Sequence, residues 1–143
     1  MDRHARITGL GQEIVHHLAC CELVVVEGVV PGARGGSSTD RAAGWWWVIG
    51  SLIRREVPVA VVAPVSLKLA MTGSGKADKA ALAVALTRLW PEADVTSSDC
   101  CDAAGLAHLG AVRLGWDVPT LERHRACKAE WPDCLDLTTE PAA

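Results

Sequence analysis

The sequence contains neither a membrane-length apolar run nor an overall excess of basic residues. Its most apolar stretch, GWWWVIGSLI at residues 44–53, is far shorter than the roughly 20 residues that a spanning helix requires. The formal net charge of −3 gives the whole chain no general attraction for nucleic acid. We therefore expect no membrane partner, and binding to a polyanion would depend on a local group of basic residues.

Cysteines with metal-ligand spacing are also missing. The six cysteines stand at positions 20, 21, 100, 101, 127 and 134, and the adjacent pairs do not form C-x-x-C motifs. This pattern argues against a zinc site. Because no secretory signal precedes the cysteines, we expect reduced thiols in a cytosolic compartment.

A nucleotide-binding loop is suggested and then excluded by the stretch TGSGKADKAALAVALTRLW, residues 72–90. The Walker pattern needs a glycine where Ala70 stands and a hydroxyl where Ala77 stands. The stretch is better explained as a glycine-containing turn followed by an amphipathic helix that ends near Trp90. Lys76 and Lys79, three residues apart, would share a face at the start of that helix, where the helix dipole disfavours cations. This placement predicts an anionic ligand.

Charge is unevenly distributed, and the sum conceals a basic middle segment. Residues 1–27 carry two basic and four acidic side chains, residues 28–90 carry eight and three, and residues 91–143 carry four and ten. The middle segment is therefore the part of the chain that we expect to face an anion.

Strand and helix patterns alternate along the chain, which predicts the α/β class. We expect helices at 2–19, 40–55 and 99–115, a helix that has Asp78 and Lys79 in its first turn and runs to Trp90, and a short helical turn after Pro64. Buried strands are expected at 22–28 and 58–64, and residues 93–98 would form a short strand or a capped turn. Beyond Trp116 the periodicity disappears, so we divide the chain into a domain at 1–116 and a loosely packed, acidic, proline-containing tail at 117–143.

Three carboxylates stand at positions where acids are costly. Glu27 ends an otherwise apolar strand, and Asp99 and Asp102 open a helix and share one of its faces. Alone, the aspartates are explained by helix capping and Glu27 by a strand end that meets solvent. Gathered above an α/β sheet, the three would form a hard-oxygen site for Mg²⁺ or Mn²⁺. Two such ions can clamp the oxygens of a phosphodiester displacement.

Combined, these motifs resemble the RuvC family of Holliday junction resolvases. The resemblance rests on Glu27 at the end of VVVEG, on K-x₃-T-G-S-G-K-A-D-K from Lys68, and on D-x-x-D-A from Asp99. It extends from about Arg3 to Gly115, and HRACKAEWP at 124–132 is similar to the tail of phage and actinobacterial members.

The resemblance implies a three-layer ribonuclease H-like fold, a homodimer, and Mg²⁺-dependent cleavage of four-way or other branched DNA in a bacterial or phage-infected cytoplasm. Mn²⁺ would be able to replace Mg²⁺. Glu27, Asp99 and Asp102 would be the catalytic and metal-binding carboxylates. Lys68, Lys76 and Lys79 would bind the DNA backbone, and Arg34, or Val30, would occupy the position of a junction-opening residue.

One departure concerns the start of the chain, because the family's first strands and first catalytic aspartate have no counterpart here. We expect an N-terminally shortened domain whose VVVE strand lacks a neighbour. The alternative to a nuclease is therefore a non-catalytic module that binds branched DNA or mediates dimerisation.

The helix at 40–55 is the predicted dimer contact, because Trp45, Trp46 and Trp47 cannot all face one core. A helix buried on two sides within one subunit is the alternative interpretation. An interfacial helix anchored by these tryptophans is a third, less favoured, interpretation.

Overall fold

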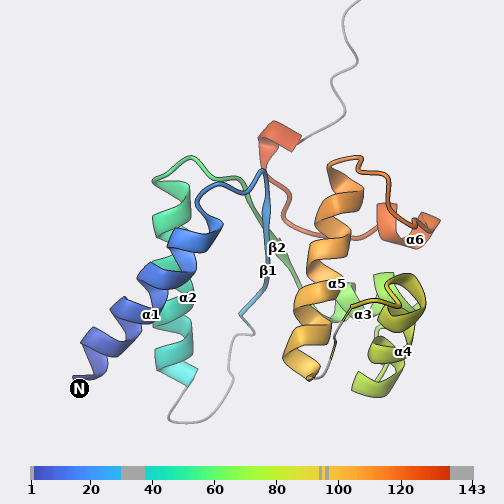
Figure 1. Cartoon of the computed structure of the whole chain (residues 1–143), viewed down its shortest axis with the longest axis horizontal. Coiled ribbons are helices and arrows are strands. Elements are labelled where there is room, and N and C mark those ends of the chain that lie inside the picture. The colour runs from blue at the N-terminus through green and yellow to red at the C-terminus, as the bar shows by residue number, and fades with distance from the viewer. Residues whose placement is uncertain (1, 30–37, 94, 96, 136–143) are drawn as a thin grey trace, which may run out of the picture. The chain divides into compact units, whose positions relative to one another are not determined.

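The computed structural model describes residues 2–29, 38–93, 95 and 97–135. The elements follow the alternation that the sequence predicts (Figure 1). In chain order they are α1 (Arg3–Leu18), β1 (Val24–Glu27), α2 (Ser38–Ile53), β2 (Val59–Val62), α3 (Pro64–Thr72), α4 (Lys79–Leu89), α5 (Ser98–Arg113), α6 (Glu122–Arg125) and the 3₁₀ turn η1 (Asp133–Leu135).

The two strands form a parallel pair, as buried apolar runs in an α/β chain should. The amide of Val24 donates to the carbonyl of Pro58, and the amide of Gly28 donates to the carbonyl of Val62, both at 2.9 Å. Because both bonds join residues with the same offset, β1 and β2 run in one direction and their carboxyl ends lie at the same edge (Figure 1).

The chain divides into two compact units, of which the first comprises Met1–Val24 and Val29–Val59. Here α1 packs on α2. Gly11 of α1 is the point of closest approach, because a Cβ at this position would lie 2.6 Å from the Trp47 ring. Val15 is buried in this contact, whereas Leu10 and Ile14 are exposed.

The second unit comprises Val25–Gly28 and Ala60–Ala143 and contains a continuous apolar core. Helices α3, α4 and α5 pack against one another around it. Its most buried members are Val62, Leu67, Met71, Leu82, Leu86 and Leu109. Gly105 of α5 lets that helix approach α3 closely, since a Cβ there would stand 3.0 Å from Leu67 Cδ1.

Residues 121–135 pack against this core, contrary to the loose packing expected beyond Trp116. Arg123 donates from Nε to the carbonyl of Ala70 at 2.9 Å, which satisfies an acceptor in the last turn of α3. Cys127 is buried, and Glu130 pairs with Val61 in an antiparallel bridge at β2. The periodicity signal failed here because the contacts are made by isolated side chains and one bridge, and these have no repeating pattern.

Within the described ranges, no helix combines the length and the apolar character needed to cross a bilayer.

Candidate active site

Glu27 stands at the carboxyl end of β1, where a parallel pair directs its strand ends to one edge. The residues before it are valines, of which Val24 is buried and Val25 and Val26 are half-buried. Glu27 is itself half-buried, so its carboxyl group emerges from an apolar strand without being fully surrounded by solvent. A carboxylate in such a position is costly unless another charge or a ligand compensates it.

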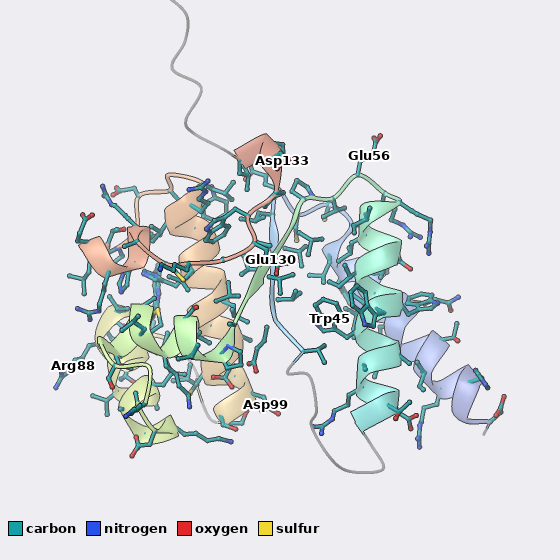
Figure 2. All side chains as sticks on the ribbon, turned by 180° about the vertical axis from the view of Figure 1, so that it is seen from behind. Trp45, Glu56, Arg88, Asp99, Glu130 and Asp133 are labelled. Carbon is teal, nitrogen blue, oxygen red and sulfur yellow. The ribbon has the colours of Figure 1, made fainter. Side chains whose placement is uncertain are left out.

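The N-terminal end of α5 supplies Asp99, in the first turn, and Asp102, at the start of the second. The cap of this helix is Ser97, whose hydroxyl accepts from the amide of Cys100 at 3.1 Å. Because a serine performs the capping that had been offered as the ordinary role of the aspartates, neither carboxylate is needed for it. Asp99 is exposed and Asp102 is half-buried (Figure 2 labels Asp99 at this end of α5).

The electrostatics of Glu27 show that these residues converge. Burial raises the pKa of the Glu27 carboxyl group above its ordinary value, and the negative charges of Asp102 and Asp99 raise it further, while the ammonium group of Lys68 opposes them. Charges act in this way only over short distances. The fold thus gathers groups from β1, α3 and α5 that are widely separated in the sequence.

Lys68 reaches this region because of how α3 is placed. Pro64 starts α3 directly after β2, at a position where the missing amide of proline costs nothing. The close approach of α3 and α5 at Gly105 then brings the Lys68 side of α3 beside the turn that carries the aspartates.

The glycine segment joins two helices, which explains why it is not a nucleotide loop. Gly73 ends α3 in the left-handed conformation (φ 84°), and Asp78 caps α4 by accepting from the amide of Ala81 at 2.8 Å. A Walker loop would follow a strand. Since α4 begins at Lys79, Lys76 lies in the preceding loop, and the prediction that both lysines share a helical face is wrong.

Lys79 links the beginnings of α4 and α5. Its Nζ donates to Ser98 Oγ at 3.0 Å, and the Ser98 hydroxyl lies 3.4 Å from Asp99 Oδ1. Lys79 therefore lies beside the carboxylate group, whereas Lys76 is simply exposed. Sequence reasoning overlooked Ser98, and its position next to Asp99 was the available signal. Arg34 lies outside the described residues.

The donor chemistry suits a hard divalent cation. Glu27, Asp99 and Asp102 offer carboxylate oxygens. Burial first, and then the charges of Asp102 and Asp99, raise the pKa of Glu27, and a bound cation would offset both effects. The three carboxylates lie at one edge but are not arranged around a single point. In the described part of the chain, no group of three or more His, Cys, Asp or Glu residues is arranged to hold a metal ion.

Comparison with known proteins finds relatives in the family that the sequence motifs resemble. No family model matches the chain. Three curated relatives are each described as crossover junction endodeoxyribonuclease RuvC. The protein of Frankia alni is 39% identical over 92 residues, covering 62% of this chain and 44% of the relative. Those of Frankia casuarinae and a Parafrankia species are 34% and 36% identical, covering 78% and 73% of this chain and 63% and 57% of the relatives.

Solved structures show the same relationship at the level of fold. The structure of Thermus thermophilus RuvC matches with a TM-score of 0.66 and 21% identity, over 84% of this chain and 75% of that one. The T. thermophilus RuvC in complex with Holliday junction substrate matches with a TM-score of 0.58 and 20% identity, over 84% and 76%. This chain spans about half the length of the curated relatives, between 44% and 63%. The expected α/β, ribonuclease H-like architecture is confirmed, and the chain is RuvC-like in both sequence and fold.

Proposed function

We propose that this protein is a structure-selective endodeoxyribonuclease that cleaves four-way or other branched DNA by metal-dependent phosphodiester hydrolysis. The observation that carries the proposal is the convergence of Glu27, Asp102, Asp99 and Lys68 on one edge of the second unit. The identity to proteins named crossover junction endodeoxyribonucleases supports it. The six free cysteines agree with action in a reducing cytoplasm.

In this proposal Glu27, Asp99 and Asp102 hold Mg²⁺, with Mn²⁺ as a substitute. Bound there, the ion would supply a water of lowered pKa and would stabilise the negative charge that develops on the phosphate. Glu27 is half-buried at the end of β1, so the strand fixes the position of its backbone. The raised pKa of Glu27 implies that its proton competes with cation binding as the pH falls.

The basic residues bind and position the phosphate backbone. Lys68 stands close enough to Glu27 to influence its pKa, so a phosphate that it binds would lie beside the carboxylates. Lys79 holds Ser98 next to Asp99, and Lys76 is exposed in the adjoining loop. Arg34 completes the proposed set from outside the described residues. Contacts of this kind recognise the shape of the backbone more than the base sequence.

The substrate class follows from the relatives. One similar structure is named as a RuvC in complex with Holliday junction substrate, and we propose branched DNA as the partner of this chain by analogy. Binding should depend strongly on salt, because phosphate contacts release counterions and the chain is acidic overall.

The direct test is incubation with an end-labelled four-way junction and Mg²⁺, beside a linear duplex of the same sequence. We expect nicks in the junction from the parent chain, and none from Glu27→Gln or Asp102→Asn. Both variants should still shift the junction in a gel, because a neutral isostere removes a charge that repels phosphate. Asp133→Asn is the matched control, since Asp133 is an exposed acid near the other end of α5 (Figure 2).

Two results would contradict the proposal. Nicking that persists unchanged in Glu27→Gln and Asp102→Asn would place the chemistry elsewhere or in a contaminant. A junction that shifts with the parent but is never nicked, with Mg²⁺ or with Mn²⁺, would identify a branched-DNA-binding module instead.

We also propose a homodimer with α2 in the interface. Trp46 is 65% exposed on α2, and Ile53 on the same helix is similarly exposed. Leu10 and Ile14 of α1 add apolar surface within the same unit. Sedimentation of the parent should show a concentration-dependent dimer that Trp46→Gln weakens. Val84→Thr, at an exposed apolar residue of α4, should leave the dimer intact.

A further inference from the structure

A cleft lies at the end of α5 away from the aspartates, within the second unit. It has a volume of about 350 Å³, which is in the range of small-ligand sites. We call it the tryptophan cleft, and its chemically functional lining consists of Arg113, Trp116, Thr120, His124, Arg125 and Trp131. The described residues that line it include no carboxylate.

The tryptophans of this cleft are held by neighbouring groups. The Arg113 guanidinium lies over the ring of Trp131, 5.3 Å from its centroid, and its Nη2 donates to the carbonyl of Leu135 at 2.9 Å. Gly115 turns the chain after α5 with a φ of 74°, and the amide of Trp116 returns to the carbonyl of Ala111 at 3.0 Å. The Trp116 side chain is 56% exposed, although its backbone is anchored. An anchored, exposed indole is a stacking surface.

His124 ends a chain of hydrogen bonds whose direction can be worked out. Trp90 Nε1–H can only donate, so His108 Nδ1, at 3.2 Å, must accept. The proton of neutral His108 is therefore on Nε2, which donates to His124 Nδ1 at 3.0 Å. The amide of Leu121 donates to the same atom at 3.2 Å. His124 consequently carries its own proton on Nε2.

The Nε2–H group of His124 is a donor without an acceptor among the described residues. The side chain is only 2% exposed, and a buried donor left unpaired is costly, so such groups nearly always have a partner. Burial, His108 and Arg123 lower the pKa of His124 to about 4, which keeps this donor neutral at physiological pH. Arg125, exposed at the rim, adds a permanent positive charge.

We propose that the tryptophan cleft binds a single nucleotide unit, with the base against tryptophan and the phosphate between Arg125 and His124. The lining combines flat aromatic surface, cations and the neutral His124 donor, which are the kinds of group that recognise an unstacked base and its phosphate. Arg113 lies 14 residues after Asp99 on the same helix, about 20 Å away at 1.5 Å per residue. The inference does not depend on the nuclease proposal, because the cleft shares no residue with the carboxylates.

The test is calorimetric titration of the intact chain with thymidine monophosphate and, separately, with a short oligothymidylate. The parent should bind at least one of them. Trp116→Leu and Arg125→Gln should each weaken binding by about tenfold or more, whereas Arg88→Gln should bind as the parent does. Arg88 is exposed in the same unit and does not line this cleft. Far-ultraviolet circular dichroism of each variant verifies that it is folded.

The two probes separate the sources of the nucleotide. Equal affinity for the monophosphate and the oligomer assigns the cleft to free nucleotides, and binding of the oligomer alone assigns it to an unpaired nucleotide of a DNA strand. Absence of binding by either probe would overturn the proposal. So would inorganic phosphate that binds as tightly as the monophosphate, or unchanged affinity in both cleft variants. Junction nicking, measured in parallel, depends on Glu27 and reports separately on the proposed nuclease.

Discussion

The buried pair His108 and His124 should make the protein lose stability in mild acid. Their ring nitrogens lie 3.0 Å apart, and both side chains are almost fully buried. A second proton on His124 Nδ1 would break this contact, and a second proton on His108 Nδ1 would break the bond from Trp90. The pKa of His124 falls from the usual 6.5 to about 4, chiefly through burial and then through His108 and Arg123. The unfolded chain therefore binds more protons than the folded chain between pH 6.5 and 4, and stability falls as the pH falls through this window.

The size of the effect follows from the same values. At about 1.4 kcal/mol per pKa unit, the full effect for His124 is about 3 kcal/mol, and about 2 kcal/mol is already lost at pH 5. Because the pKa of His108 is also lowered by burial, its contribution has the same sign. These amounts are large against the usual total stability of 5–15 kcal/mol.

Urea unfolding gives the free energy of unfolding of each variant at pH 7.5 and at pH 5.0, and the difference between these two values measures the effect. The parent should lose at least about 2 kcal/mol, and His124→Phe, which cannot titrate, should lose distinctly less. His17→Gln removes an exposed histidine and should behave as the parent does. Equal stability of the parent at both pH values, or an undiminished difference in His124→Phe, would refute the reasoning.

Three further predictions concern the carboxylate site and its support. Relative to Glu27→Gln, the parent should lose stability as the pH rises above about 4.5, because a raised pKa means that the folded state holds the Glu27 proton more tightly than the unfolded chain does. Urea unfolding at several pH values in metal-free buffer measures this difference. A relative stability that increases with pH would contradict the prediction. Lys68→Gln should raise the pKa of Glu27 further and shift the acid limb of the nicking profile upward, and an unshifted profile would remove Lys68 from the site. Gly105→Ala should destabilise by about 1 kcal/mol because Leu67 is buried in the core and would have to shift, whereas Gly9→Ala, with open space around it, should stabilise slightly. Equal thermal shifts for the two variants would count against the close packing.

Local pattern accounts for the parts of the fold that could be predicted. The valine run of β1, the cap signals before α4 and α5, and the helical period up to Trp90 each act within a few residues, so the predicted elements are close to the observed ones. Spacing alone does not decide which face of α1 is buried, and Leu10 and Ile14 are apolar but exposed. Contact with Trp47 selected the face that contains Gly11.

The candidate site, like the fold, could be predicted only in part. The motifs around Glu27, Lys68 and Asp99 were sufficient to nominate the carboxylates, because acids are costly in apolar surroundings and therefore stand out in a sequence. Their convergence depends on parallel strand pairing and on the close approach at Gly105, and both are contacts between distant parts of the chain. The bond from Lys79 to Ser98 likewise joins helices that the sequence treats separately.

The sequence by itself determined the α/β alternation, the resemblance to RuvC and the identity of the acids, since each of these depends on residue type and short-range spacing. Only the tertiary structure decided that residues 121–135 pack against the core, that Lys76 stays in a loop, and that His108 and His124 form a buried chain beside a tryptophan cleft. The physical reason is that burial and charge coupling depend on which segments meet. No local pattern encodes the partners of an isolated side chain.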